Sequence, residues 1–247
     1  LTRMGLLVDK MFRNSLSTNM DAIVTFSAAK RIFGQRTINI SNGVDFDSIP
    51  IHAFTKTDDA IHLVGVAEVH YWHGYDRMVA GLGEYYKKNP DGKKVYFHIV
   101  GGIWSGNLVD SKNAPGIQTL IDKYGIADYV VMHGQLFGEK LDEVFNKSIF
   151  AVGSLGRHRS GITEIKTLKN REYATRGIPF IYSETDSDFD DKPYVVKAPA
   201  DETPVDVERI IDFLDSFKMQ PEEVRKTVEH LTWKIQMKKV VDDVMTR

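Results

Sequence analysis

The hydrophobic pattern from residue 61 onward predicts strands that alternate with helices. Apolar runs without two-residue alternation predict strands at residues 61–66, 95–100, 129–132, 149–152, 180–182 and 194–197. The segments between them predict helices at residues 74–88, 115–125, 139–146 and 161–176. Uniformly apolar strands that alternate with helices are typical of a parallel sheet covered on both faces. We therefore expect an α/β fold, a Rossmann-like doubly wound parallel sheet.

The two ends of the chain show a different pattern. Residues 1–45 predict a helix at 5–14, a strand at 22–26, a short helix at 28–33 and a strand at 37–40, too little to bury a core of their own. Residues 204–245 predict two helices separated near Gln220 and Pro221. We therefore divide the chain into residues 1–45, residues 46–200 and residues 201–247, and expect the last segment to pack on the second.

The loops that follow the predicted strands are the places to look for chemistry. In open parallel sheets, ligands bind beyond the carboxyl ends of the strands. This rule selects residues 65–74, 101–106, 133–137, 153–161 and 183–191.

Composition and charge exclude several classes of protein. The chain has 247 residues, a net charge of -2 and no cysteine, so nothing favours nucleic-acid binding, disulfides or thiolate metal sites. No apolar run approaches the roughly 20 residues of a membrane span. The glycine-rich fingerprint of dinucleotide enzymes, the P-loop and the nucleophile elbow of hydrolases are all missing.

Two glutamates in the predicted helix 161–176 form the strongest single feature. Glu164 and Glu172 are eight residues apart, which corresponds to about 12 Å along a helix axis. Carboxylates at that separation cannot share one metal or proton, but they suit the two ends of an elongated ligand. The alternative is a partly buried Glu172 paired with a structural Arg or Lys, and spacing alone favours it.

The loop at residues 153–161 combines small residues with Arg157, His158 and Arg159 before a predicted helix N-terminus. Backbone N–H groups and the helix dipole favour anions at such a place, so a diphosphate suits it. A solvated basic loop is an equally good interpretation.

Metal binding finds little support. His70 and His73 lack a visible third ligand, and a surface loop is the better interpretation. The acidic segment 184–191 contains an Asp-x-Asp pair similar to that of metal-dependent GT-A glycosyltransferases, but the flanking pattern does not fit that fold. We expect a solvated loop there, no metal and no cofactor.

Several blocks, in a common order, resemble retaining group 1 glycosyltransferases of the GT4 type, which have the GT-B fold. The segment from Glu164 to Pro179 resembles their E-x7-E helix followed by Gly-x-Pro and a strand. Similar blocks are found at residues 40–45 (Ile-Ser-Asn-Gly-Val-Asp), 72–77 (Trp-His-Gly-Tyr-Asp-Arg), 97–102, 131–134 and 232–234. The resemblance covers the chain from about Asp21 to its end. It implies the C-terminal, donor-binding half of such an enzyme, with residues 1–45 as a remnant of the N-terminal acceptor domain and its linker.

The resemblance also implies roles for individual residues. Glu164 would contact hydroxyls of the transferred sugar as the catalytic residue, and Glu172 would bind the ribose. The backbone amides of Gly161, Ile162 and Thr163 would hold the sugar or the diphosphate. The base would lie against residues 133–136, which include His133, Gly134 and Leu136.

The sequence departs from the family where two cations usually grip the diphosphate. Val66 occupies the position of the expected Arg, and His73 that of the expected Lys. The residues that could replace them are His73 itself, Arg77, Lys169 and Arg157.

The resemblance implies transfer of a sugar from a nucleotide-diphosphate donor to a glycan or lipid-linked acceptor, as in polysaccharide biosynthesis. We expect a cytoplasmic protein, with any attachment to the inner membrane face made by the missing domain, and no nucleic-acid partner. The chain starts without Met at Leu1, so we expect a fragment. Because the resemblance places the acceptor pocket in the other half of such enzymes, we expect this fragment to be inactive alone. The alternative, motivated by the two lost cations, is a non-catalytic sugar-nucleotide or phosphate-binding module, or a degenerate partner subunit.

Overall fold

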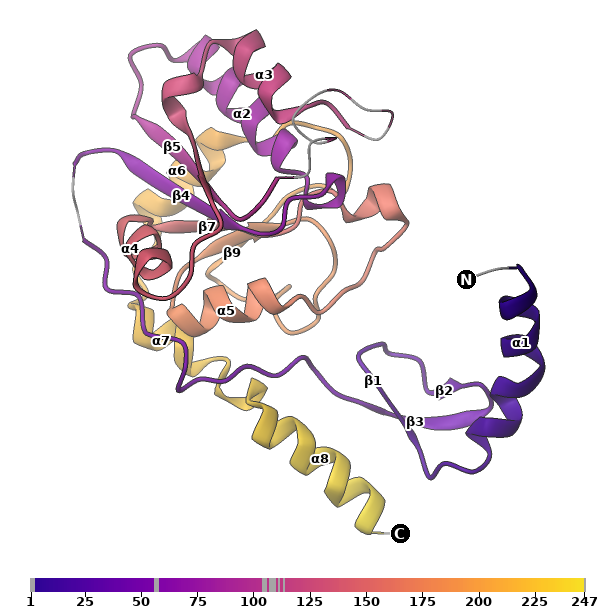
Figure 1. Ribbon diagram of the computed structural model, residues 1–247. Coiled ribbons are helices and arrows are strands. Elements are labelled where there is room, and N and C mark those ends of the chain that lie inside the picture. The colour runs from indigo at the N-terminus through magenta and orange to yellow at the C-terminus, as the bar shows by residue number, and fades with distance from the viewer. Residues whose placement is uncertain are drawn as a thin grey trace. The chain divides into compact units, whose positions relative to one another are not determined.

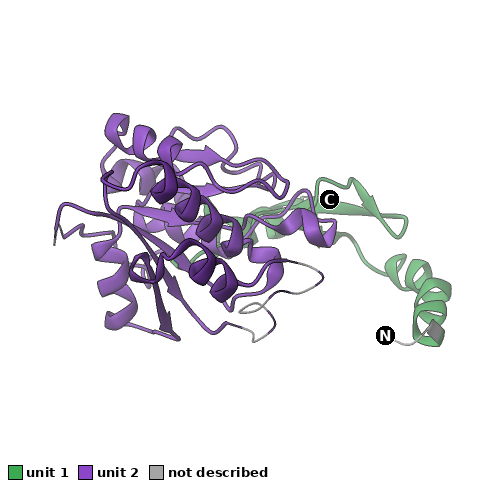
Figure 2. Cartoon of the chain, turned by 90° about the horizontal axis from the view of Figure 1, so that it is seen from above, with its two compact units in different colours: residues 1–45, 230–247 green, residues 46–229 purple. Residues whose placement is uncertain are grey.

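The computed structural model describes residues 3–55, 58–103, 106, 110, 112 and 114–246 (Figure 1). The chain divides into two compact units, residues 46–229 and residues 1–45 with 230–247 (Figure 2). The last helix groups with residues 1–45, whereas residues 201–229 group with the sheet.

The larger unit is built on one parallel sheet. Its strands are β4 (Ile61–Val66), β5 (Val95–Val100), β6 (Val130–Gly134), β7 (Phe150–Val152), β8 (Phe180–Tyr182) and β9 (Val195–Lys197). They lie in the order β6-β5-β4-β7-β8-β9, and every neighbouring pair is parallel. In chain order this is the 3-2-1-4-5-6 arrangement of Rossmann folds, so the predicted fold class is confirmed.

Helices cover both faces of this sheet (Figure 1). One side holds α2 (Tyr75–Lys88), α3 (Ile117–Tyr124) and α6 (Val207–Ser216), which share a buried apolar core with β4 and β5. The other side holds α4 (Glu139–Lys147) and α5 (Leu168–Arg176). Short 3-10 helices are found at Tyr71–His73, Ala127–Tyr129, Arg157–Ser160 and Glu229–Leu231.

The predicted helix 161–176 begins seven residues later than expected. Thr167 is extended and its hydroxyl accepts a hydrogen bond from the N–H of Asn170 at 3.4 Å, which caps α5. The preceding backbone instead forms a parallel bridge between Glu164 and Thr185. The C-terminal end agrees with the prediction. Gly177 has φ +84°, and a Cβ there would lie 2.3 Å from the carbonyl oxygen of Pro221.

The tail contains three helices rather than the predicted two. The carboxylate of Asp206 caps α6, and α7 (Pro221–Lys226) begins with proline in its first turn. A further helix, α8 (Trp233–Met245), begins at Thr232, whose hydroxyl accepts from the N–H of Ile235.

The smaller unit contains α1 (Arg3–Ser17), β1 (Ile23–Thr25), β2 (Arg31–Ile32), β3 (Gln35–Asn39) and α8. β1 and β3 are parallel, whereas β2 pairs with β3 in an antiparallel hairpin. The predicted helix 28–33 is therefore wrong. Phe33 and Gly34 have φ of 50° and 82°, as a tight hairpin turn requires. The N–H of Ser41 donates to Gln236 of α8 at 2.8 Å, which fastens the last helix to this unit.

Candidate functional site

The strand order reverses between β4 and β7, so the loops that follow these strands mark the topological switch point. The two loops touch, since the N–H of Leu155 donates to the carbonyl of His73 at 2.8 Å. Glycine is required at this contact. Gly74, the N-cap of α2, has φ +66°, and a Cβ there would lie 2.6 Å from the backbone nitrogen of Gly156. Both loops belong to the segments that the sequence selected.

His73 is 7% exposed and lies at this contact. Its Nδ1 accepts a hydrogen bond from the N–H of His70 at 3.0 Å, so the neutral ring carries its proton on Nε2. Burial, reinforced by the nearby cations Lys169 and Arg157, lowers the pKa of His73 to about 2. His73 can therefore donate a hydrogen bond, but it does not replace the charge of the lysine expected here.

Arg77 on α2 is occupied by the backbone. Its guanidinium donates to the carbonyl oxygens of Thr203 at 2.8 Å, Pro199 at 3.0 Å and Leu155. Arg77 therefore holds the loop after β7 against the segment after β9, and its guanidinium is already engaged rather than available to a phosphate.

The basic loop is only partly available to an anion. Arg159 forms a bidentate pair with Asp76, at 2.8 and 2.7 Å, and a further contact of 2.6 Å with Glu202. Nε2 of His158 donates to the same Glu202 at 2.7 Å. Arg157 is different, because its Nε is buried without a hydrogen-bond partner among the described residues.

Lys169, the second residue of α5, lies near Arg157. Its ammonium is 3.5 Å from the hydroxyl of Tyr75. Burial lowers the pKa of Lys169 to about 7. The positive charge of Arg157 lowers this pKa further, whereas the carboxylate of Glu184 raises it. Two cations that sequence reasoning offered as phosphate contacts are thus brought together at the switch point.

Glu184, just after β8, is a residue that sequence reasoning missed. It is 2% exposed, and within the described part of the chain neither carboxylate oxygen makes a hydrogen bond. Burial raises the pKa of Glu184 to about 7. Its own backbone N–H and the cations Lys169, Arg157 and Lys197 lower the pKa, but by less than burial raises it. We call His73, Arg157, Lys169 and Glu184 the switch-point cluster.

The rest of this acidic segment is not the solvated loop that we expected. Asp186 is 0% exposed and pairs with the equally buried Arg171 at 2.8 Å. Asp188 also pairs with Arg171. The guanidinium brings these two carboxylates together and holds Asp186 in the interior, whereas Thr185, Ser187 and Asp191 of the same segment are exposed.

The predicted sugar contacts lie at the C-terminal end of the 3-10 helix Arg157–Ser160 and in the segment after it, rather than at a helix N-terminus. The N–H groups of Gly161 and Ile162 already donate to the carbonyls of His158 at 2.9 Å and Arg157 at 3.2 Å. Thr163 accepts from Thr185 at 2.8 Å, and the side chain of Glu164 is exposed.

Glu172 lies on α5 with Oε1 3.0 Å from Nε of Arg176, which also contacts Asp142 at 2.7 Å. This is the paired glutamate that the sequence offered as the alternative. Because Glu164 lies before the helix, the 12 Å helical rise estimated for the two glutamates does not apply.

The predicted base contact His133 is the end of a chain of three histidines across β6, β5 and β4. His133 Nε2 is 2.8 Å from His98 Nδ1, and His98 Nε2 is 2.9 Å from His62 Nδ1. His62 Nε2 is 3.0 Å from a carboxylate oxygen of Asp58. An ionised Asp58 can only accept a hydrogen bond, so His62 must carry its proton on Nε2. His98 and His133 then carry their protons on Nε2 as well, because each donates to Nδ1 of the next ring. Nδ1 of His133 is left as an acceptor.

The histidine relay, which we define as Asp58, His62, His98 and His133, lines a cavity of about 460 Å³ together with side chains of α4. Burial lowers the pKa of all three histidines, that of His98 to about 3. The other predicted base contacts lie just beyond it, with Gly134 exposed and Leu136 half-buried. Residues 104 and 105 of the predicted ligand loop 101–106 lie outside the described residues.

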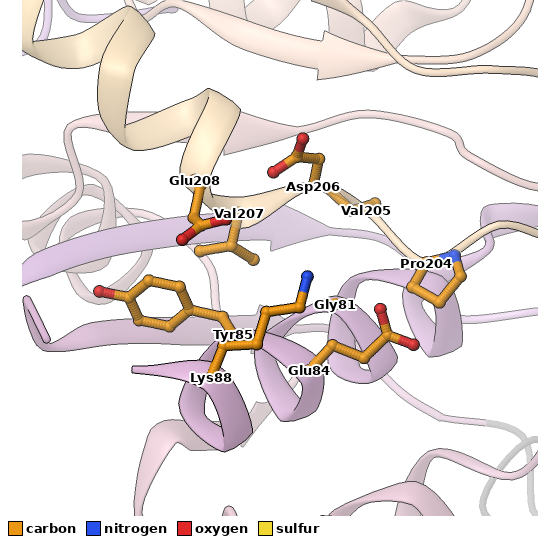
Figure 3. A pocket seen from close by; sticks show the side chains of 9 residues that line it. All are labelled: Gly81, Glu84, Tyr85, Lys88, Pro204, Val205, Asp206, Val207 and Glu208. Atoms are coloured by element: carbon orange, nitrogen blue, oxygen red, sulfur yellow. The ribbon is translucent and has the colours of Figure 1, made fainter. Parts of the chain in front are cut away.

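A second surface groove lies between α2 and the start of α6 (Figure 3). It has a volume of about 230 Å³ and is lined by Glu84, Asp206 and Glu208 against the single cation Lys88. This acidic lining repels anions, so the groove does not suit a diphosphate.

Within the ranges that the structure describes, no group of three or more His, Asp or Glu side chains could hold a metal ion. No helix of the described chain combines the length and apolar character that crossing a membrane requires.

No protein-family model and no curated protein matches the chain. Solved structures do. Sucrose-phosphate synthase from Thermosynechococcus elongatus is 17% identical, over 96% of this chain and 61% of that chain, with a TM-score of 0.67. Anabaena HepE, in complex with UDP-glucose, is 10% identical, over 96% of this chain and 69% of that chain, with a TM-score of 0.65. The pneumococcal O-GlcNAc transferase GtfA, in complex with UDP and GlcNAc, is 13% identical, over 95% of this chain and 47% of that chain, with a TM-score of 0.56.

At these identities the likeness shows the fold, a Rossmann-like parallel sheet that matches the C-terminal domains of GT-B glycosyltransferases. This chain spans less than two thirds of the length of the synthase.

Proposed function

We propose that the chain is the donor-binding part of a glycosyltransferase that takes a nucleotide-diphosphate sugar as substrate. One observation carries the proposal: the half-buried cations Arg157 and Lys169 lie beside the hydrogen-bond donor His73 at the switch point of a Rossmann-like sheet. The fold neighbours HepE and GtfA have UDP-glucose, or UDP and GlcNAc, bound.

The cations would perform the chemistry by electrostatics. When the glycosidic bond to the diphosphate breaks, negative charge grows on the leaving phosphate, and cations fixed beside it stabilise that charge. Lys169, whose pKa burial lowers to about 7, would become fully charged once a diphosphate replaces its lost solvation. His73 would add a neutral hydrogen bond from Nε2. The scheme routes no step through a metal or a cofactor.

The remaining roles follow the family resemblance. Glu164 would contact sugar hydroxyls. Glu172 would bind the ribose once its ion pair with Arg176 has opened. Residues 133–136 would contact the base, and the backbone of residues 161–163 the sugar. Of these backbone groups, the N–H of Thr163 fits best, since those of Gly161 and Ile162 are already hydrogen bonded.

The acceptor side would come from a further Rossmann-like half, to which residues 1–45 belong. On α1 the side chains of Met4, Leu7, Met11 and Phe12 are exposed, as are Ile235 and Val241 on α8, so both helices present apolar surface to such a half. The parent enzyme would transfer the sugar with retention to a glycan or lipid-linked acceptor, as in polysaccharide biosynthesis in the cytoplasm. The isolated chain would bind donor without turnover.

A specific observation supports the second candidate, a non-catalytic sugar-nucleotide-binding module. Val66 and the neutral His73 occupy the positions where the resembling family has cations, so this chain would hold a leaving diphosphate with fewer charges. Such a module would bind the nucleotide and never support transfer, even when joined to an acceptor half.

Calorimetric titration with UDP, GDP and ADP and with their glucose or mannose conjugates tests the proposal. We expect one nucleotide to bind, and Glu172→Ala to weaken it about tenfold through loss of the ribose contact. Glu208→Ala, far from α5 in sequence and exposed, is the control. Absence of binding by all three nucleotides at millimolar concentration would contradict the proposal, and detection of glycosyl transfer by the isolated chain would contradict the expected inactivity.

A further inference from the structure

Glu184 combines burial, an ionisable carboxyl group and the absence of a hydrogen-bond partner among the described residues in a way that the fold does not explain. Its side chain is 2% exposed, and neither carboxylate oxygen is hydrogen bonded by another described residue. A buried carboxylate without hydrogen bonds is costly, and native proteins rarely keep one.

The neighbouring cations do not satisfy it. Lys169 and Arg157 act on Glu184 through space, and neither forms an ion pair or hydrogen bond with it. Lys197 is engaged elsewhere, because its ammonium donates to Asp190 at 2.8 Å and to the backbone carbonyl of Glu184. Nor is Arg157 satisfied, since its Nε is buried without a partner in the described ranges.

Unpaired polar atoms of both signs therefore meet at the switch point. Cations alone would suit a bare phosphate, and a carboxylate among them would weaken phosphate binding by repulsion. An ionised carboxylate only accepts hydrogen bonds, so its natural partners are hydroxyl groups. A ligand that joins phosphate to hydroxyls matches both halves of the cluster, and a sugar diphosphate is such a ligand.

We propose that Glu184 accepts hydrogen bonds from hydroxyl groups of the sugar in the nucleotide-sugar donor, and so selects the intact donor over the free nucleotide diphosphate. This inference rests on the proposed function. It gives Glu184 a role in specificity, while Arg157 and Lys169 contact the phosphates.

The proposal predicts effects of opposite sign on two ligands. Glu184→Gln keeps the size of the side chain but removes its charge. UDP, which has no sugar hydroxyls beyond the ribose, should bind as tightly as to the native protein or up to about tenfold more tightly, because a repulsive charge is gone. UDP-glucose should bind about tenfold more weakly, because charge-assisted hydrogen bonds become neutral ones.

Calorimetric titration of UDP and UDP-glucose, with GDP and GDP-mannose as a second pair, measures both effects. Glu84→Gln, an exposed glutamate on α2, is the control and should change neither affinity. Glu184→Asp is the second variant. It keeps the charge but withdraws the oxygens, so it should weaken only the sugar conjugate.

Three results are decisive. A rise in the ratio of the donor Kd to the nucleotide Kd of tenfold or more in Glu184→Gln supports the inference. An unchanged ratio, with the native protein binding both ligands, overturns the inference and leaves the proposed function standing. Failure of the native protein to bind any of the four ligands overturns the proposed function and the inference with it.

Discussion

Glu184 and Asp186 lie two residues apart in the loop after β8, and both are almost completely buried, at 2% and 0% exposure. Asp186 pairs with Arg171 at 2.8 Å, whereas neither oxygen of Glu184 has a hydrogen-bond partner among the described residues. Burial raises the pKa of both carboxyl groups, but Arg171 opposes the rise at Asp186 by direct hydrogen bonds. We therefore expect the paired carboxylate of Asp186 to serve the fold and the unpaired one of Glu184 to serve a ligand.

The same contrast separates the histidine relay from the switch-point cluster. In the relay every imidazole is hydrogen bonded to its neighbour, and the chain ends on Asp58. In the switch-point cluster, polar atoms of Arg157 and Glu184 have no partner in the described ranges. We expect substitutions in the paired groups to change stability, and substitutions in the unpaired groups to change binding.

The largest effect on stability is expected from Asp186. Asp186→Ala leaves Arg171 buried with one carboxylate partner fewer, and should lower the free energy of unfolding by about 3–5 kcal/mol. Glu184→Ala should leave the stability unchanged or raise it, because it removes an unpaired buried charge. Urea denaturation of both variants measures the difference, and an equal loss in the two would break the comparison.

A smaller effect is expected from acidification of the relay. The pKa of His98 falls from 6.5 in the unfolded chain to about 3 in the folded chain. Between these pH values the imidazole is protonated in the unfolded chain but not in the folded chain, so acidification favours unfolding. The stabilisation is complete above pH 6.5 and is lost as the pH falls toward 3, by on the order of 2–4 kcal/mol for this group.

His98→Gln should therefore flatten the dependence of stability on pH between 6.5 and 4, while the exposed His230→Gln serves as the control. Thermal unfolding at several pH values provides the measurement. Parallel curves for native protein and His98→Gln would show that the relay does not titrate in this way.

The smallest effect concerns the start of α5. Thr167→Ala removes the N-terminal cap and should cost about 1 kcal/mol of stability. Thr163→Ala, four residues earlier, should cost almost nothing, because that position is exposed and outside the helix. If Thr163 proved the more costly substitution, the helix would begin near Gly161 after all.

The strands of the larger sheet were predictable because each is a short, mainly apolar run without two-residue alternation. Residues 61–66, 95–100 and 180–182 are strands with the predicted bounds. The start of α5 was not, because Ser160 and Gly161 resemble a helix start and nothing local shows that residues 163–165 pair with Thr185. The competing hydroxyl of Thr167 sets the boundary instead.

The candidate site was predictable only in part. The loops after β4 and β7, which contain His73 and Arg157, follow from the topology rule for open parallel sheets. Lys169 on α5 was named only as a possible replacement for the cations that the resembling family uses. Glu184 was missed because an acidic run in sequence is typical of solvated loops, while the groups that enclose it come from distant segments. The relay was invisible for the same reason, since only the register of β4, β5 and β6 brings His62, His98 and His133 together.

Arg157 and Lys169, the two cations of the switch-point cluster, are proposed to hold a nucleotide diphosphate. The most direct test is calorimetric titration of UDP, GDP and ADP into the double variant Arg157→Ala/Lys169→Ala beside the native protein. A second double variant, Lys93→Ala/Lys123→Ala, removes the same charge from exposed positions. We predict that the first weakens the best nucleotide by about 30-fold or more and the second by less than about threefold. Equal losses in the two variants would contradict the claim, because binding would then depend on net charge rather than on this site.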